Sequence, residues 1–388
     1  MRPVRTLQTV TTRIPPLAEP GPELTPTQVS RYSRHLLVPG MGLDAQRRLL
    51  NARVAVVGAG GLGSPILAYL AAAGAGHLTV IDDDVVDVTN LQRQVLHRTD
   101  DVGRRKADSA AEFVRGLNPD VTVEVRHTRI TPENAEELLA GHDLVLDGAD
   151  NFPTRYAVSD ACAALGLPVV WAAVLRFDAQ ISAFVPGVDG AVSLRDLYPV
   201  PPLPEDVPSC SEAGVLGALV GQVGSIMAGE AVKLLCGFGE PLVGRVLLID
   251  ALSQRTREIP LRPVGAVVPP RVPEPVRELV PLDEVEPEEV AALLRRTPRP
   301  VLLDVREPAE HALGTVPGAL TIPVGEVLTW EDGRAPLPDG PVVVYCKAGP
   351  RARRAAAHLV RIGHPDVRVM TGGMLAWIER VDPSLPSY

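Results

Sequence analysis

Two short segments of the 388-residue chain carry residue types that could do chemistry. The first is a glycine-rich run that directly follows the apolar run 53–57 and contains Gly58, Gly60, Gly61 and Gly63. Glycines let a backbone approach a phosphate, and a helix that begins there presents N–H groups to the phosphate charge. Asp82 ends the next apolar run, 19 residues beyond Gly63, where an acid can bind a ribose hydroxyl. The pattern predicts nucleotide binding; a turn needed only for packing is the alternative.

Further polar groups follow the later apolar runs. They are Asn90 and Arg93 in N-L-Q-R-Q, Lys106 after G-R-R, and Asp150 with Asn151 in D-G-A-D-N. Two cations and a carboxylate beside the phosphates favour ATP with Mg²⁺ over a nicotinamide dinucleotide, because phosphoryl chemistry needs neutralised charge. Only three of the 38 basic residues are lysines, so Lys106 indicates a need for a compact ammonium group.

The second segment is Cys346-Lys347-Ala348-Gly349-Pro350-Arg351, which lies between an apolar run and a helical pattern. Backbone N–H groups that surround a sulfur at a helix N-terminus, with Lys347 and Arg351 nearby, stabilise an anionic persulfide. Gly349 belongs to the same persulfide loop, whereas Pro350 has no N–H and removes one donor.

The other three cysteines have different settings. Cys210 follows a proline-rich loop and precedes a helix, which favours the thiolate and hence a covalent role, although a structural loop cysteine is the alternative. Cys162 and Cys236 lie within helical patterns and are interpreted as small buried hydrophobic residues.

The elements that must position these residues alternate along the chain. Strands are expected at 53–58, 77–82, 121–125, 143–147 and 168–174, with helices at about 62–74, 104–117, 132–140 and 152–166. This alternation predicts an α/β fold with a Rossmann-like, mostly parallel sheet, which further strands near 177–185, 244–250 and 254–260 extend. Its strands would bring the polar groups to one edge.

Composition divides the chain into four parts. We expect a disordered arm over 1–24, a nucleotide-binding domain over 25–262, a proline-rich linker over 263–281 and a smaller α/β domain over 282–388. A net charge of −9 without a basic block argues against nucleic-acid or membrane partners. Four scattered cysteines and a polar N-terminus predict a reducing, cytoplasmic location, and the apolar run 213–229 is interpreted as a buried helix.

The first domain resembles the MoeB/ThiF family, relatives of ubiquitin-activating enzymes. The resemblance rests on R-Y-S-R-H at 31–35, G-A-G-G-L-G, T-N-L-Q-R-Q, G-R-R-K and D-G-A-D-N. It implies adenylation, with ATP and Mg²⁺, of the C-terminal Gly-Gly of a ubiquitin-like sulfur carrier. It assigns Gly61, Asp82, Asn90, Arg93 and Lys106 to ATP and Asp150 to Mg²⁺. It also implies a homodimer in which Arg34 reaches the partner's phosphates, and a thioester or acyl disulfide at Cys210. Outside their motifs, Arg34 and Arg93 would be ordinary surface arginines.

The second domain resembles a single-domain rhodanese. L-D-V-R-E at 303–307, H-x-x-G-T-V-P-G-A at 311–319 and T-G-G-M-x-A-W at 371–377 carry this resemblance with the cysteine loop. It implies that Cys346 carries the sulfur and that Asp304 and Arg306 support the pocket; an inactive regulatory rhodanese is the alternative. Many MoeB/ThiF-type enzymes hold a structural zinc with two C-x-x-C pairs, and this chain has none, so we expect no zinc. The combination is similar to the two-domain MoeZ-type proteins.

The sequence therefore predicts an adenylyltransferase and sulfurtransferase that converts a carrier's C-terminus into a thiocarboxylate for molybdopterin, cysteine or thio-cofactor biosynthesis. The expected sulfur donor is thiosulfate or a desulfurase that bears a persulfide. Two alternatives are a nicotinamide-dependent oxidoreductase with an accessory rhodanese and a non-catalytic scaffold for ubiquitin-like proteins. Binding of NAD would favour the first, and absence of ATP–pyrophosphate exchange would favour the second.

Overall fold

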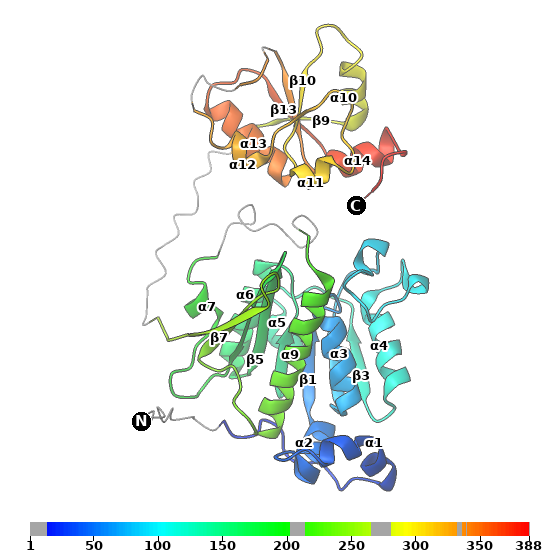
Figure 1. Ribbon diagram of the computed structural model, residues 1–388, viewed down its shortest axis with the longest axis vertical. Coiled ribbons are helices and arrows are strands. Elements are labelled where there is room, and N and C mark those ends of the chain that lie inside the picture. Colours follow the sequence, from blue (N-terminus) through cyan, green and yellow to red (C-terminus); the bar gives the residue numbers. More distant parts are fainter. Residues whose placement is uncertain (1–13, 202–213, 265–280, 332–335, 339, 388) are drawn as a thin grey trace. The chain divides into compact units, whose positions relative to one another are not determined.

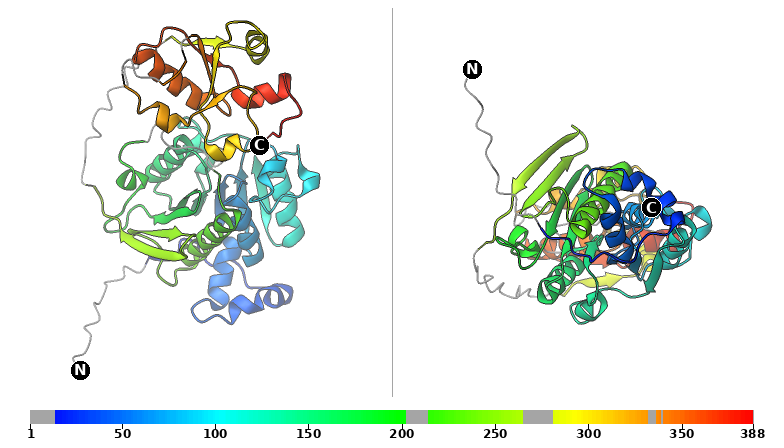
Figure 2. Two further views of the ribbon diagram at one scale, coloured as in Figure 1. Left: turned by 45° about the horizontal axis from the view of Figure 1, so that its top comes forward. Right: turned by 90° about the horizontal axis from the view of Figure 1, so that it is seen from below.

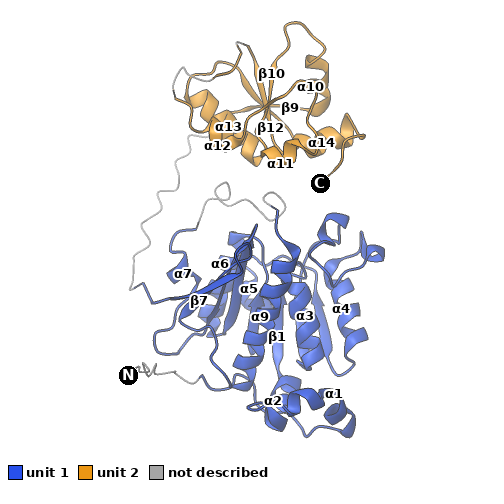
Figure 3. Ribbon diagram, in the orientation of Figure 1, with its two compact units in different colours: residues 1–202, 208–269 blue, residues 203–207, 270–388 orange. Residues whose placement is uncertain are grey.

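The computed structural model describes residues 14–201, 214–264, 281–331, 336–338 and 340–387 (Figure 1). These residues form two compact units, which are described separately because their relative placement is not determined (Figure 3). The first unit lies before the 265–280 segment and the second unit lies after it. The linker expected over 263–281 falls mostly outside the described residues, so its boundaries stay a prediction.

The first unit is built on an eight-stranded sheet in the order β3-β2-β1-β4-β5-β6-β7-β8. The strands are β1 Arg53–Val57, β2 His77–Ile81, β3 Thr122–Arg126, β4 Leu144–Asp147, β5 Val169–Leu175, β6 Asp178–Phe184, β7 Arg245–Asp250 and β8 Arg255–Pro260. The first five strands in this order, from β3 through β1 to β5, run parallel to one another. The remaining strands β6, β7 and β8 each pair antiparallel with the strand before them. The expected α/β class is confirmed, with every expected strand in place.

Helices cover both faces of this sheet because successive side chains of a strand point to opposite sides. Val54 and Val56 pack with α3 (Gly63–Ala73), α4 (Lys106–Leu117) and α9 (Gly217–Cys236), and α3 and α9 lie side by side in Figures 1 and 2. Ala55 and Val57 pack on the other face, with the helices α5 Ala135–Leu139, α6 Phe152–Leu165 and α7 Leu194–Leu197. The central strands are therefore buried on both sides.

Helix α9 is long and apolar enough to cross a membrane by length and composition, with a mean hydropathy of 1.3. In the structure 61% of its apolar window is buried within the protein, where Val223, Met227 and Leu234 join the core shared with α3 and β1. This burial agrees with its interpretation as a core helix. The described residues contain one other, shorter apolar helix, α3.

The N-terminal segment corrects one expectation. Residues 14–24 were expected to belong to a disordered arm, yet Ile14 and Ala18 are buried in the main core. The Leu17 and Ala18 N–H groups donate to the carbonyls of Leu234 and Leu235 at the end of α9. The proline content that suggested disorder is compatible with an extended segment, and the few apolar side chains of this segment pack into the main core. Residues 1–13 lie outside the described part.

Helices α1 (Pro26–Leu36) and α2 (Gly42–Asn51) precede β1 and lie at the amino ends of the strands (Figure 1). The Arg31 side chain donates to the Leu117 carbonyl, and the Tyr32 hydroxyl lies 3.0 Å from Asp120 Oδ2. Both contacts are at the C-terminal end of α4. These helices therefore cover the amino ends of the strands, whereas the glycine-rich loop lies at their carboxyl ends.

The second unit has a five-stranded parallel sheet in the order β11-β10-β12-β13-β9. Its strands are β9 Asp283–Val285, β10 Val301–Asp304, β11 Leu320–Thr321, β12 Val342–Tyr345 and β13 Val367–Met370. The helices α10 Pro287–Leu293 and α14 Gly373–Arg380 share one core with the sheet, and α12 Val324–Val327 and α13 Pro350–Arg361 share the other. The short helix α11 spans Pro308–His311.

Gly76 offers a test of the packing beneath the first sheet. A Cβ at Gly76 would lie 1.8 Å from the Leu50 carbonyl oxygen, which is backbone of α2 and cannot rotate away. We expect Gly76→Ala to lower the free energy of unfolding by roughly 2 kcal/mol or more, measured by urea denaturation. Gly116→Ala in α4 is the matched control, because its Cβ meets nothing within 4 Å. The control should raise stability by about 0.5–1 kcal/mol, and equal effects of both substitutions would contradict this view of the packing.

Candidate functional site

The glycine-rich loop joins β1 to α3, and each of its glycines is required, or not required, for a different physical reason. Gly58 has a φ of +84°, which favours glycine, and a Cβ at Gly63 would lie 2.0 Å from the Gly58 carbonyl oxygen. A Cβ at Gly61 would lie 2.7 Å from the Val220 side chain. Gly60 differs, since a Cβ there would be 3.5 Å from Gln94 Nε2, an ordinary contact. The protein itself therefore leaves room at Gly60.

The start of α3 presents unpaired donors. The N–H groups of Gly60, Gly61 and Leu62 donate to no carbonyl or side chain within the part of the chain that the structure describes. The Gly60 carbonyl, by contrast, accepts from both the N–H and the hydroxyl of Ser64. Consecutive unpaired N–H groups at a helix N-terminus form a site for an anion such as phosphate.

Asp82 lies directly after β2, as expected, and its two carboxylate oxygens hold backbone. Oδ2 accepts from the Ala59 N–H at 2.8 Å and Oδ1 accepts from the Asp84 N–H at 2.8 Å. Burial raises the pKa of this carboxyl, and the two N–H donors and Lys106 partly offset that effect. Asp82 thus anchors the glycine-rich loop in addition to any contact with a ribose.

Lys106 begins α4 and is buried, with 7% of its surface exposed. Its Nζ lies 2.9 Å from Asp84 Oδ2, and its N–H donates to the Asp84 carbonyl. The scarce lysine is therefore a positive charge next to the loop that follows β2.

Asn90 and Arg93 lie in the segment between β2 and α4. Asn90 ends a 3-10 turn over Val88–Asn90, and its Oδ1 accepts from the Asp87 N–H. One Nη of Arg93 donates to the Thr89 carbonyl, and its side-chain carbons pass near Gly61. The structure thus places Arg93 beside the glycine-rich loop, as the sequence predicted.

The loop after β4 lies against the loop after β1. A Cβ at Gly148 would be 2.8 Å from the Val57 carbonyl oxygen, so the two backbones touch. Asp147 Oδ1 accepts from the Ala149 N–H at 3.0 Å, and Arg155 Nε donates to the Ala149 carbonyl at 3.1 Å. The Arg155 guanidinium also stacks on the rings of Phe152 and Trp171. This loop is therefore fixed from both sides by buried groups.

Asp150 and Asn151 follow in the same loop and are exposed. Asn151 Oδ1 caps α6 by accepting from the Thr154 N–H, and its Nδ2 donates to Asp150 Oδ1 at 3.3 Å. Mg²⁺ in nucleotide sites is held by one or two carboxylates together with substrate phosphates and water. A single exposed carboxylate next to the glycine-rich loop fits that requirement.

Arg34 is not brought to this site within the chain. It is exposed on α1, which contacts the C-terminal end of α4, whereas Lys106 begins the same helix. The twelve residues of α4 separate these two ends by about 18 Å. An Arg34 that contacts phosphate would have to come from a second copy of the chain.

In the second unit, Cys346 follows β12 and is fully buried. Its Sγ accepts from the Gly349 N–H at 3.1 Å, and Gly349, with a φ of +123°, precedes α13. The Met374 N–H of α14 donates to the Cys346 carbonyl at 2.8 Å, while Leu375 donates to the Lys347 carbonyl at 3.1 Å. The loop therefore turns back so that one of its N–H groups meets the sulfur, and α14 holds the loop through two of its carbonyls.

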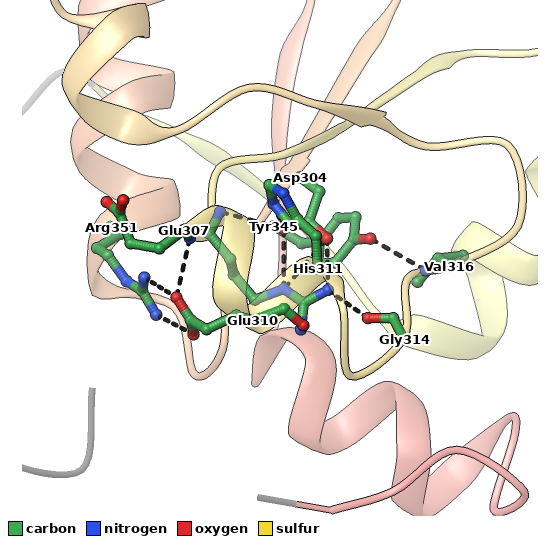
Figure 4. Close-up of polar contacts among 9 residues, drawn as sticks. Asp304, Glu307, Glu310, His311, Gly314, Val316, Tyr345 and Arg351 are labelled. Atoms are coloured by element: carbon green, nitrogen blue, oxygen red, sulfur yellow. Dashed lines mark hydrogen bonds and ion pairs between the residues drawn. The ribbon is translucent and has the colours of Figure 1, made fainter. Parts of the chain in front are cut away.

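A buried polar cluster supports this loop (Figure 4). Arg306 and Asp304 are fully buried and bidentate, with Nη2 to Oδ2 at 2.6 Å, and Arg306 also donates to the Gly314 carbonyl. Arg306 Nη1 reaches the carbonyl of Glu310, whose carboxylate binds both Nη atoms of Arg351 at 2.6 and 2.8 Å. Burial alone would raise the pKa of Glu310, but the Arg351 contact and further donors lower it. Arg351 is thereby positioned at the end of the loop.

Sequence reasoning missed Asp84, His97, Arg155 and Glu310. Glu310 forms a capping box with Glu307, so a capping pattern was its only local signal. His97 and Arg155 bond to carbonyls 38 and 6 residues away, contacts that no spacing rule reveals. Cys162 and Cys236 are buried as expected, and burial raises the pKa of both thiols. Cys210 lies outside the described residues.

The segments at 193–199 and 262–264, where the resemblance to the MoeB/ThiF family would put the two C-x-x-C pairs, meet through a hydrogen bond. The Val264 N–H donates to Asp196 Oδ1 at 2.8 Å, and the Ser193 hydroxyl donates to Asp196 Oδ2 at 3.0 Å. Among the described ranges, no group of three or more His, Cys, Asp or Glu side chains could hold a metal. That the protein lacks a structural zinc stays a prediction.

Comparisons with known proteins agree with this geometry. A model of the ThiF family matches residues 32–265, more than half of the chain. The chain belongs to the ThiF family. A model described as a rhodanese-like domain matches residues 286–380. The chain is therefore a ThiF-family adenylyltransferase fused to a rhodanese-like sulfurtransferase domain.

Relatives of this ThiF-family chain match nearly all of it or about three fifths of it. A probable adenylyltransferase/sulfurtransferase MoeZ of Mycobacterium tuberculosis is 43% identical over 98% of this chain and 100% of its own length. The SAMP-activating enzyme E1 of Haloferax volcanii is 52% identical over 62% of this chain and 87% of its own. The solved structure of E. coli MccB with ATP covers 61% of this chain and 73% of its own, with a TM-score of 0.53 at 22% identity, and shows the shared fold.

The buried Asp147 predicts a pH dependence of stability. Burial raises the pKa of its carboxyl from 3.8 to about 6, with Arg155 and the Ala149 N–H opposing the shift. A carboxyl with a raised pKa in the folded state stabilises below its unfolded pKa and loses that contribution as pH rises through the folded value. Between pH 4 and 7, wild type should lose about 2 kcal/mol of unfolding free energy relative to Asp147→Asn. Urea denaturation across this range measures the difference, and a flat difference would contradict the assignment.

Proposed function

We propose that the first unit adenylates the C-terminal Gly-Gly carboxylate of a ubiquitin-like sulfur carrier and that the second unit supplies the sulfur. The observation that carries the proposal is that one chain holds two sites. The first is the set of unpaired N–H groups at the start of α3, near Lys106 and Arg93, and the second is Cys346 in its loop. The relatives named as a sulfurtransferase and as a SAMP-activating enzyme support this choice of substrate.

In the adenylation step, a carboxylate oxygen of the carrier attacks the α-phosphorus of ATP and the bond to pyrophosphate breaks. Both reactants are negative, so Arg93, Lys106 and the N–H groups of the glycine-rich loop must offset their repulsion. The space at Gly60 suits a phosphate, because no protein group requires glycine there. Asp82 and Asn90 are assigned to the nucleotide as well.

Two further residues of the proposed adenylation site lie outside the glycine-rich loop. Asp150 would hold the Mg²⁺ that accompanies ATP, and that ion supplies neutralisation of phosphate charge. Arg34 would reach the phosphates of a second copy, because it lies at the far end of α4 within its own chain. We therefore propose a homodimer.

In the sulfur step, the Cys346 thiolate attacks the outer sulfur of thiosulfate and sulfite leaves, or it accepts sulfur from a persulfide-bearing desulfurase. The terminal sulfur of the Cys346 persulfide then attacks the carrier's acyl carbon, and AMP leaves. Cys210 is assigned to the next step: its thiolate attacks Cys346 Sγ, which releases the thiocarboxylate and forms a disulfide. A cellular thiol reductant then restores both cysteines.

The thiocarboxylate would serve molybdopterin, cysteine or another thio-cofactor pathway. We propose a cytoplasmic location, which the three described cysteines support because all of them are free thiols. A nucleic-acid or membrane partner is not proposed, since the chain has a net charge of −9.

The assignment of Asp150 predicts a loss of adenylation. Asp150→Ala should lower carrier-dependent ATP–pyrophosphate exchange by about 100-fold or more, because the metal would lose its protein ligand. Asp160→Ala is the matched control, since Asp160 is an exposed carboxylate on α6 that pairs with Arg195. Exchange should persist in the control, and near-normal exchange in Asp150→Ala would sink the assignment.

The assignment of Cys346 predicts a mass change. Thiosulfate should add one sulfur atom to the wild-type chain by intact mass spectrometry, whereas Cys346→Ser should add none. The serine variant should retain ATP–pyrophosphate exchange, because adenylation takes place in the other unit. Cys210→Ser is the matched control, since its role follows sulfur loading, and it should gain the sulfur. A wild-type thiol left unchanged by thiosulfate would count against the sulfurtransferase step.

A further inference from the structure

His97 is a buried histidine, 6% exposed, that the adenylation steps above do not use. Its Nε2 lies 2.9 Å from the Ala59 carbonyl oxygen in the glycine-rich loop. Its Nδ1 lies 2.8 Å from the hydroxyl of Ser109, which is buried on α4. One imidazole ring therefore joins the glycine-rich loop, the segment that carries Arg93, and the helix that Lys106 begins.

The contacts decide where the ring protons lie. A carbonyl oxygen only accepts, so Nε2 must carry a hydrogen and donate it to Ala59. Burial lowers the pKa of His97 and Lys106 adds to that effect, whereas the bond to the Ala59 carbonyl, Asp101 and Asp82 oppose it. The ring is therefore neutral at pH 7, which leaves Nδ1 unprotonated beside the Ser109 hydroxyl, a group that also bonds to Asp101.

Fixing the Ala59 carbonyl also fixes the next N–H group. In a trans peptide the C=O and the N–H point in opposite directions, so a carbonyl held by His97 turns the Gly60 N–H away from the imidazole. Asp82 holds the Ala59 N–H in the preceding peptide. Both peptide planes that flank Ala59 are thus set by buried side chains, and the Gly60 N–H has no acceptor within the described part of the chain.

We propose that His97 is a positioning residue for the nucleotide, whose neutral Nε2–H holds the Ala59–Gly60 peptide so that the Gly60 N–H faces the phosphates of ATP. His97 does not touch the nucleotide itself. The inference rests on the proposed function, because it requires ATP to bind at the glycine-rich loop.

Two substitutions separate the two ring nitrogens. Gln places an amide N–H close to the position of Nε2 and can still donate to the Ala59 carbonyl, whereas Asn reaches only as far as Nδ1. His97→Asn should weaken ATP binding about tenfold, because the buried Ala59 carbonyl loses its donor and its peptide can rotate. His97→Gln should bind ATP within about threefold of wild type.

Equilibrium dialysis with labelled ATP, without any carrier, measures these affinities. In carrier-dependent exchange, His97→Asn should raise the KM for ATP and change kcat at saturating ATP much less, because the defect is in placing the loop. Equal ATP affinity for wild type and His97→Asn would overturn the inference. Wild type that binds no ATP would instead overturn the proposed function.

His142 provides a matched control. It also bonds one backbone carbonyl and one hydroxyl, at Leu139 and Thr79, but lies away from the glycine-rich loop. His142→Asn should change thermal stability as His97→Asn does while leaving ATP affinity unchanged. Equal losses of ATP affinity in both variants would show a general effect of unfolding and overturn the inference.

The tautomer gives a readout independent of activity. In ¹⁵N-histidine spectra of the full chain at pH 7, compared with those of His97→Gln, the His97 resonances should show a protonated Nε2 and an unprotonated Nδ1. The opposite tautomer would leave the Ala59 carbonyl without a donor and overturn the proposal.

Discussion

The loop after β1 and the loop after β4 touch backbone to backbone, and the rest of the nucleotide site depends on that contact. A Cβ at Gly58 would lie 3.1 Å from the Gly148 carbonyl oxygen, and one at Gly148 would lie 2.8 Å from the Val57 carbonyl oxygen. Because β1 and β4 are neighbours in the parallel sheet, their carboxyl ends deliver both loops to one edge. The contact places the loop that carries Asp150 against the loop that leads into α3.

Side chains from elsewhere in the first unit then hold each loop at an alanine. Ala59 is held by Asp82 and His97, and Ala149 is held by Asp147 and Arg155. In both cases a carboxylate accepts from the N–H while an imidazole or guanidinium donates to the carbonyl. In the second unit, an ion pair between Glu310 and Arg351 positions the Arg351 side chain at the end of the cysteine loop.

The strands and the loops can be predicted from the sequence, whereas the side-chain contacts between distant segments cannot. Apolar runs such as 53–57 and 144–147 predict buried parallel strands, and the glycines mark where the backbone must turn. By contrast, the burial of Ile14 and Ala18 depends on contacts with the core and with the end of α9, more than 200 residues later in the chain. The pairing of Lys106 with Asp84 likewise spans a crossover of 22 residues. The role proposed for Arg34 involves a second copy of the chain, so the contacts within one chain do not reveal it.

The grip on Ala59 has a consequence for the thermodynamics of ligand binding. Ordering one backbone residue costs about 1–2 kcal/mol of conformational entropy. In this protein Asp82 and His97 order the Ala59–Gly60 peptide during folding, before any nucleotide arrives. The cradle is preorganised, so the contacts made with phosphate appear in the binding affinity rather than being offset by loop ordering.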